Sequence, residues 1–257
     1  MFLLLFVFFI LGSAIGSFLN VVVDRTTRGG SILGPLRSYC DWCHATLSTF
    51  DLVPILSFVG LRGRCRYCHH KLSWQYPLVE TLLGVLFAAT FYSLAASGNF
   101  SALVVLFYLL IITVLVVVAI VDLKFSLIPT TFVFAASLIV LFWNYFQMSS
   151  SDFVTSVFSA FLLAFFFAAI VFLTRGRGMG SGDIPLVFLL GLFLGWPENL
   201  LAVFGAFLSG AIVALTLLLF GKKRLGQTIP FGPFLIASSI VVFYWGSQII
   251  VWYWGMI

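Results

Sequence analysis

The chain consists of long apolar runs separated by short polar connections. A helix needs about 20 apolar residues to cross the hydrocarbon core of a bilayer. By this criterion the pattern predicts eight membrane-spanning helices, at 1–23, 78–97, 101–121, 128–147, 153–174, 184–197, 199–220 and 229–254. The sequence therefore predicts an all-α, polytopic membrane protein with one larger polar insert at 24–77.

The sixth predicted span is short. Ile184 to Trp196 comprises 13 residues, which form a helix of about 20 Å at about 1.5 Å per residue. The hydrocarbon core is roughly 30 Å thick. We therefore expect either a locally thinned bilayer or a helix that begins inside the protein, at membrane depth.

Composition supports a membrane location for most of the chain. Of the 257 residues, 62% are hydrophobic and 8% are charged, whereas a soluble domain usually carries about 25% charged residues. A core of this length could not hide so much apolar surface from water, so lipid must be the solvent. The run 1–23 does not begin with a basic n-region, and its small residues lie inside the apolar run rather than after it, where a cleavage site would be. We therefore interpret it as a retained helix rather than a signal peptide.

The basic residues lie in alternate connections between the predicted spans. They are Arg25, Arg28, Arg37, Arg62, Arg64, Arg66, Lys71, Lys124, Arg175, Arg177, Lys222, Lys223 and Arg224. Basic loops mark the cytoplasmic side of a membrane protein. We therefore expect the insert inside and both termini outside. Because the net charge of +5 is confined to these short connections, we expect no nucleic-acid partner.

The insert contains all four cysteines, as Cys40-Asp-Trp-Cys43 and Cys65-Arg-Tyr-Cys68. A CxxC segment presents two thiolates to a tetrahedral ion, and two such segments complete a four-cysteine site, typically for zinc. Disulfides or inert thiols are the alternative, which a cytoplasmic location disfavours. Four thiolates leave no open position, so we expect a structural Zn²⁺. His69 and His70 are interpreted as surface or supporting residues rather than ligands.

Three of the eight acids lie near predicted membrane edges: Glu80, Asp122 and Asp183. Asp122 ends an uncharged run of 21 residues, and Asp183 follows a glycine-rich segment at the start of the short sixth span. An ion pair with Lys124 or a plain helix cap would be the simple explanations. Two acids at one membrane face can also share a proton and activate water for peptide hydrolysis, or serve transport.

Several motifs follow one another in a fixed order along the chain. They are Gly16–Arg25, Arg37–Cys40, Asp51–Pro54, Leu61–Cys68, Tyr76–Glu80, Asp122-Leu with Ile128-Pro129, Gly180–Asp183, Gly191–Trp196 and Pro230–Phe234. In this combination the chain resembles the type IV prepilin peptidases, a family of bifunctional leader peptidases and N-methyltransferases among the GxGD-type aspartic membrane proteases.

The resemblance implies that Asp122 and Asp183 are the catalytic pair, with Gly180 and Gly182 in the active-site loop. It implies prepilin or pseudopilin substrates, cut on the cytoplasmic side of the bacterial inner membrane after a glycine. The new N-terminal residue would then be methylated from S-adenosylmethionine, and Glu80 matches an acid linked to methylation. From the residues alone, Glu80 could equally be a helix-start acid. The implied parts are a first helix (1–23), a methyltransferase insert (24–77) and a seven-helix protease (78–257).

The chain departs from the family pattern at Asp41, Thr130 and Pro185, where the family usually has a proline, an acid and a lysine. None of these positions is a catalytic or metal-ligand position, so the departures bear on substrate range. Two other functions remain open at this point. The protein could be a peptidase without methyltransferase activity, or a non-enzymatic membrane scaffold or transporter whose insert binds a partner.

Overall fold

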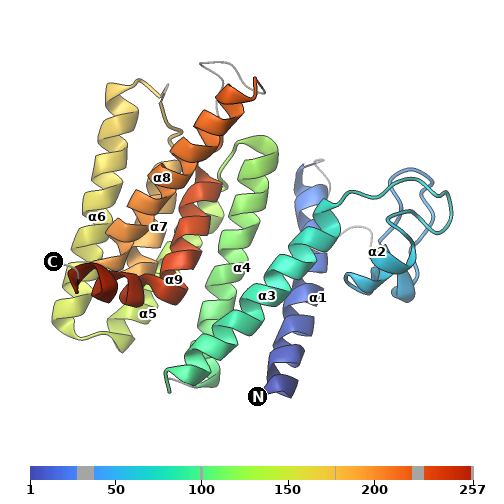
Figure 1. Cartoon of the computed structure of the whole chain (residues 1–257), viewed down its shortest axis with the longest axis horizontal. Coiled ribbons are helices and arrows are strands. Elements are labelled where there is room, and N and C mark those ends of the chain that lie inside the picture. The colour runs from blue at the N-terminus through green and yellow to red at the C-terminus, as the bar shows by residue number, and fades with distance from the viewer. Residues whose placement is uncertain (28–37, 99–100, 177, 222–228, 256–257) are drawn as a thin grey trace. The chain divides into compact units, whose positions relative to one another are not determined.

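The computed structural model describes residues 1–27, 38–98, 101–176, 178–221 and 229–255, and these residues are almost entirely helical (Figure 1). The elements are α1 (Phe2–Thr27), the 3-10 helix η1 (Thr49–Leu52), α2 (Leu56–Gly60), α3 (Gln75–Ala96), α4 (Ala102–Phe125), α5 (Thr130–Gln147), α6 (Ser150–Leu173), α7 (Asp183–Leu194), α8 (Glu198–Leu219) and α9 (Gly232–Trp254). Each predicted span corresponds to one helix, so the all-α prediction is confirmed.

Seven of the described helices are long and apolar enough to cross a membrane, and α7 is the shorter apolar helix that the sequence predicts. Their outer faces carry many exposed Phe, Leu, Ile and Val side chains, as expected where lipid replaces water. The sidedness rests on the basic residues, six of which lie outside the described residues (Arg28, Arg37, Arg177, Lys222, Lys223 and Arg224). The orientation therefore stays a prediction.

The chain divides into two compact units, Met1–Thr113 and Val114–Ile257, and the boundary falls within α4. The first unit contains α1, the cysteine insert, α3 and the beginning of α4. The second contains the end of α4 and the helices α5 to α9. The three-part division expected from the family resemblance stays a prediction, and the two units are described separately below.

In the first unit, α1 and α3 pack with their backbones almost in contact. A Cβ atom on Gly12 would lie 2.5 Å from the carbonyl oxygen of Leu83, and one on Gly16 would lie 2.9 Å from the Cα of Glu80. On the opposite helix, Gly84 faces the hydroxyl of Ser13 in the same way. Lipid gives little hydrophobic drive for helix association, so small residues that allow such close packing stabilise the pair.

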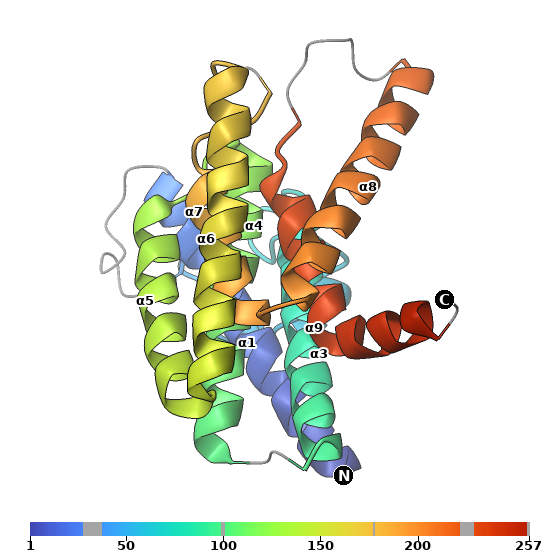
Figure 2. The same ribbon diagram turned by 90° about the vertical axis from the view of Figure 1, so that its left-hand side faces the viewer.

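In the second unit, α7 is the central helix. It packs against α5, α6, α8 and α9, and in Figure 2 part of it is visible behind α6. Leu186, Leu189 and Leu192 are completely buried, as expected for a helix that is apolar all round. Its 12 residues are therefore surrounded by protein. This favours the second sequence-based alternative, a helix that begins inside the protein.

Two polar contacts hold the C-terminal end of α7 and the start of α8. The amide of Asn144 on α5 donates a hydrogen bond of 2.8 Å to the carbonyl oxygen of Leu192. The amide of Asn199 donates one of 2.8 Å to the hydroxyl of Ser159 on α6. Gly191 lies against Ala160, where a Cβ would come within 2.8 Å of the Cα. Buried amide hydrogen bonds and glycine contacts thus fix α7 against its neighbours.

We predict that Gly12→Ala destabilises the first unit. The added methyl group meets the backbone of Leu83 rather than a movable side chain, so α1 must shift, at a cost of about 1–3 kcal/mol. Thermal unfolding in detergent, followed by circular dichroism, measures the effect. Gly60→Ala is the matched control, because a Cβ at Gly60 has no atom within 4 Å. Equal melting temperatures for the two variants would contradict the proposed packing.

Candidate functional sites

Asp122 and Asp183 come together in the second unit, although they are far apart in sequence. Asp122 lies in the last turn of α4 and Asp183 is the first residue of α7. Their side chains are 4% and 5% exposed, and the charge of Asp122 acts on the Asp183 carboxylate. Buried carboxylates are costly and are usually paired, so two of them in one site indicate a functional arrangement.

The loop before α7 holds the Asp183 carboxylate. The backbone N–H of Gly180 donates to Oδ2 at 3.2 Å, and the Asp183 N–H donates back to the Gly180 carbonyl oxygen at 3.2 Å. Gly182, not Asp183, is the N-cap residue of α7, and no side-chain cap hydrogen bond forms there. The plain helix-cap explanation is therefore not met, although the acid lies at the positive end of the helix dipole. The two glycines differ in the space around them: a Cβ on Gly180 would have an ordinary contact at 3.5 Å, whereas one on Gly182 would lie 3.0 Å from the Cβ of Ile128.

Asp122 is held against the start of α9. A Cβ on Gly232 would lie 2.5 Å from Oδ2 of Asp122 and 3.4 Å from Cδ1 of Ile128. The backbone N–H of Gly232 lies near the Asp122 carboxylate, yet Oδ2 is buried and forms no hydrogen bond of good geometry among the described residues. A buried polar atom left in this state is costly and marks a place where a water or a substrate group can bind.

Ile128 and Gly232 complete the site in a way that sequence reasoning missed. The Ile128 side chain touches both Gly182 and Gly232, so the α4–α5 connection joins the two aspartate-bearing segments. The sequence analysis quoted both positions only as parts of motifs. The sequence signal for this contact is Gly232 itself, because a glycine at the first position of a helix can allow close backbone approach.

The four cysteines form a second candidate site, in the insert of the first unit. Their Sγ atoms all lie within 4.8 Å of one another, and the sulfurs of Cys40 and Cys68 are 3.8 Å apart. Tetrahedral zinc with Zn–S bonds of about 2.3 Å requires sulfurs about 3.8 Å apart. The thiols are not paired as disulfides, and the described cluster contains no histidine. The residues therefore fit the predicted zinc ion.

The two cysteine segments are repeats of one hairpin. The bridges Tyr39–Thr46 and Arg64–Lys71 occupy equivalent positions, 25 residues apart. The first cysteine of each hairpin accepts a hydrogen bond from the N–H of a histidine four residues later, His44 or His69. Both histidines have positive φ, at 54° and 56°. The sequence signal for this repeat, not recognised as such above, is the pattern Cys-x-x-Cys-His that both segments share.

The Cys68 thiol interacts with the other three thiols of the cluster. The backbone N–H of His70 favours the Cys68 thiolate, but desolvation and the other three thiols outweigh it and raise the pKa of Cys68 to about 12. A bound divalent cation reverses this balance and holds cysteine ligands as thiolates. Trp42 stacks on His70 with ring centroids 3.9 Å apart, which gives His70 a packing role beside the cluster.

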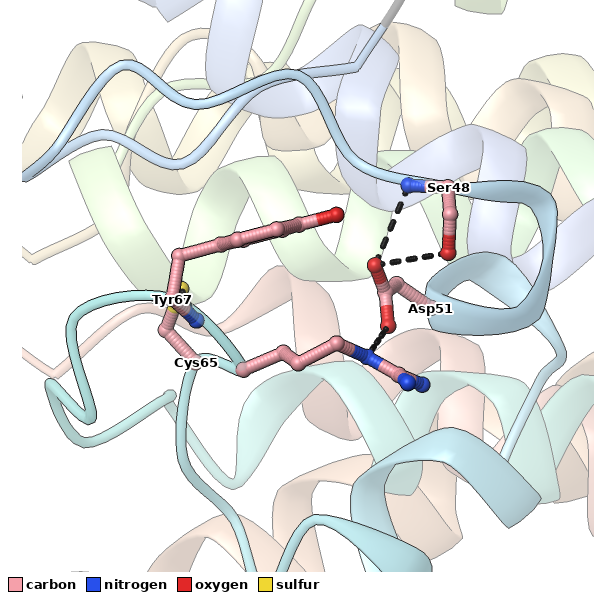
Figure 3. A network of polar contacts seen from close by, with 5 residues as sticks. Ser48, Asp51, Cys65 and Tyr67 are labelled. Atoms are coloured by element: carbon pink, nitrogen blue, oxygen red, sulfur yellow. Dashed lines mark hydrogen bonds and ion pairs between the residues drawn. The ribbon is translucent and has the colours of Figure 1, made fainter.

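Asp51 joins the two halves of the insert (Figure 3). One carboxylate oxygen accepts from the N–H and the hydroxyl of Ser48, at 3.0 and 2.9 Å, and the other accepts from Nε of Arg66 at 2.6 Å. Burial would raise the pKa of Asp51, but the Ser48 and Arg66 hydrogen bonds outweigh it and hold the pKa below its usual value. The contact thus ties the segment after the first hairpin to the second hairpin.

Glu80 lies in the second turn of α3, so the helix-start explanation does not apply. Its side chain is 7% exposed. Oε2 accepts a hydrogen bond of 2.7 Å from the N–H of Ile55, and Ser17 on α1 bonds the same carboxylate. Glu80 also lines a cavity of about 590 Å³ in the first unit. Its two hydrogen-bond partners and its place at a cavity wall keep Glu80 a candidate site residue.

The second unit carries two buried aspartates and the segment Gly180-Ser-Gly-Asp183 at the start of a short central helix, and the first unit carries a cluster of four cysteines. These are the features that the resemblance to the GxGD-type membrane proteases implies. Residues 10–94 match the Bacterial Peptidase A24 N-terminal domain, and residues 108–215 match the Type IV leader peptidase family. The chain therefore belongs to the prepilin leader peptidase/N-methyltransferase family.

Relatives of that name resemble the chain over most of its length. The Bacillus subtilis protein is 33% identical over 250 residues, covering 95% of each chain. The Legionella pneumophila protein is 34% identical over 214 residues, 82% of this chain and 72% of its own length. A Burkholderia pseudomallei protein is 31% identical over 93% of this chain and 84% of its own. No solved structure matches.

We predict one zinc ion per chain, bound by the four cysteines. Cys40→Ser should remove most of the zinc, because three thiolates bind a tetrahedral ion far more weakly than four. His70→Ala should retain it, since His70 lies outside the sulfur cluster. Elemental analysis of the purified proteins measures the stoichiometry. A chain with four free thiols and no bound zinc after mild purification would contradict the prediction.

Proposed function

We propose that this protein removes the leader peptide from type IV prepilins or pseudopilins, after the glycine that precedes their hydrophobic helix, and methylates the new N-terminal amine. The observation that carries the proteolytic part is the buried Asp122–Asp183 pair. The names of its relatives, prepilin leader peptidase/N-methyltransferase, support both activities.

The proposed hydrolysis uses the two aspartates in complementary states. One ionised carboxylate removes a proton from a water molecule as that water attacks the scissile carbonyl carbon. The other, protonated carboxylate donates its proton to the carbonyl oxygen. The C–N bond then breaks and the leaving amine takes up a proton. Two like charges in a low dielectric disfavour double ionisation, which supports this division of roles between Asp122 and Asp183.

The position of the pair suits a substrate with a basic leader and an apolar helix. Asp122 ends a membrane helix and Asp183 begins one, so we propose that both lie near the cytoplasmic interface of the bacterial inner membrane. A leader attracted to that face and a helix retained in lipid would place their junction at the same depth. We place the insert on that side too, and both termini outside, from the positive-inside rule.

The proposed methylation uses S-adenosylmethionine as methyl donor and Glu80 as the acid beside the reacting amine. The N-terminal ammonium first loses a proton to the Glu80 carboxylate, which frees its lone pair. S-adenosylmethionine, when bound, would supply the methyl group to this amine nitrogen, with the electron pair of the broken S–C bond left on sulfur. The proposed zinc ion, held by Cys40, Cys43, Cys65 and Cys68, orders the insert and takes no part in these steps.

A peptidase without methyltransferase activity remains the second candidate, because all contacts that define the aspartate pair lie in the second unit. Incubation with a prepilin and S-adenosylmethionine, followed by mass analysis of the mature N-terminus, separates the two. A cleaved product that never gains a methyl group would show that the protein is a peptidase without methyltransferase activity.

We predict that Asp122→Asn and Asp183→Asn each reduce leader cleavage by at least about 100-fold, because each removes one partner of the acid–base pair. Cleavage of a prepilin by the purified enzyme in liposomes measures this. Asp152→Asn is the matched control: the Asp152 carboxylate accepts a hydrogen bond from the Ser149 hydroxyl, the Asp152 N–H donates to that hydroxyl, and the residue lies at the start of α6, outside the site. If either variant of the pair cleaves normally, the aspartic protease proposal fails, and the result favours the alternative of a scaffold or transporter.

We predict that Gly232→Ala lowers kcat for leader cleavage by about ten-fold or more, because the new methyl group overlaps the Asp122 carboxylate and moves it. Gly210→Ala, on α8, is the control: its Cβ would make ordinary contacts of 3.5 Å or longer. The melting temperatures of both proteins should be compared, so that displacement of Asp122 is separated from unfolding. Full activity in Gly232→Ala would show that this contact does not position Asp122.

A further inference from the structure

Residues 52–61 of the insert, which we call the α2 segment, have two different sides. One side lines the cavity of about 590 Å³ in the first unit, which we call the insert cavity, with Ser57 and Phe58. The other side carries Leu56 and Val59, which are 71% and 67% exposed and lie outside the lining that the described residues form. Residues three apart share one face of a helix, so the α2 segment presents an apolar face to its surroundings.

The α2 segment lies beside membrane-spanning helices rather than beyond their ends, and Figure 1 shows α2 next to α1, below the level at which α3 begins. The N–H of Ile55 donates to Glu80 at 2.7 Å, and Glu80 packs against Gly16 of α1. Gly16 precedes Arg25, in the last turn of α1, by nine residues, or about 14 Å of helix at about 1.5 Å per residue. Because a basic residue marks the membrane edge of a span, the α2 segment is held at a depth where lipid surrounds α1.

The backbone of the α2 segment is suited to apolar surroundings. The N–H groups of Ser57, Val59 and Leu61 each donate to the carbonyl oxygen four residues earlier, at 2.9–3.0 Å. The N–H of Ile55 is bound by the Glu80 carboxylate, and the segment contains no charged side chain. Backbone polar groups at membrane depth must find their partners within the protein. The α2 segment can therefore lie in lipid without leaving these N–H groups unpaired.

Side chains around the α2 segment match those found at the edge of a bilayer. Trp74, directly before α3, is 71% exposed, and its ring packs against Phe58 with centroids 5.0 Å apart. Tryptophan is enriched at membrane interfaces. Arg62 and Arg64 follow the segment and are exposed, and arginines at a membrane surface attract anionic lipid headgroups. An apolar face is thus combined with an interfacial aromatic ring and two cations.

We propose that the α2 segment is a monotopic membrane anchor, whose face of Leu56 and Val59 inserts into the lipid leaflet on the side of the insert. Arg62 and Arg64 bind the anionic headgroups of that leaflet. An exposed apolar face marks a membrane or protein contact, and the depth of this one beside α1 selects lipid as its occupant. The proposal concerns the outer side of the segment and is independent of both proposed activities.

The test uses the full-length protein in nanodiscs, without a prepilin and with a fluorescent coumarin amino acid in place of Val59. Lipids brominated in their acyl chains should quench at least about half of this fluorescence, and aqueous iodide less than about a tenth, because the label lies among acyl chains. The same label in place of Tyr67 is the control. Tyr67 is 48% exposed between Arg66 and His69, which are exposed polar residues of the second cysteine hairpin, so the opposite pattern is expected there.

Two results overturn the proposal. The first is iodide quenching of the Val59 label as strong as that of the Tyr67 label, in proteins whose melting temperatures match that of the unlabelled chain. The second is quenching by brominated lipid that disappears when a prepilin is added, since this would assign the face to the hydrophobic helix of the substrate. Quenching that persists with a prepilin present supports lipid as the occupant.

The headgroup contact has a test of its own. Changing the nanodisc lipid from zwitterionic phosphatidylcholine to anionic phosphatidylglycerol should raise the lipid quenching of the Val59 label by at least about 1.5-fold. The double variant Arg62→Gln, Arg64→Gln should lose this increase and keep the quenching seen in phosphatidylcholine. An increase that persists in the double variant would refute the assignment of the two arginines to the headgroups.

Discussion

Close approach at glycine positions is the constraint on which the surroundings of Glu80, Asp122 and Asp183 depend. Gly16 brings α1 against Glu80 in the first unit, and Gly232 brings α9 against Asp122 in the second. Gly182 similarly admits the side chain of Ile128 beside Asp183. In lipid there is little hydrophobic driving force for helix association, because lipid tails are as apolar as the side chains. Close packing at small residues therefore supplies the stability. Each of the three candidate acids therefore lies beside a glycine at which an added Cβ would crowd a neighbouring atom.

The same constraint explains how charged groups survive in an apolar chain. A carboxylate at membrane depth is costly unless other groups compensate it. Asp183 receives an N–H from the loop before α7, and Glu80 receives one from Ile55. The Gly180 donor belongs to irregular backbone, which is permitted at membrane depth only where protein surrounds it. The burial of α7 by α5, α6, α8 and α9 provides that surrounding in the second unit.

The sequence predicted the helices well because membrane spans are long and their apolar pattern is unambiguous. The start of α7 at Asp183 differs by one residue from the expectation, and the choice between a thinned bilayer and a buried start required its packing. For Asp122 and Asp183, the sequence could predict only that both lie at the same membrane face, not that their side chains share one site. Distances between helices depend on contacts such as Gly232 with Asp122, and no local pattern encodes these.

In the cysteine insert, too, features set by local sequence could be predicted, whereas features set by contacts between distant segments could not. The CxxC spacing predicts the ligand set, because each pair lies within one turn. The roles of the individual cysteines become clear only from the repeat: the first cysteine of each hairpin, Cys40 or Cys65, is buried, whereas Cys43 and Cys68 are exposed. The buried pair belongs to the wall of the insert cavity. A segment of this size rarely folds without a staple, so the zinc ion that we propose would join the two hairpins and also maintain the cavity; metal binding and cavity formation would then be a single folding event.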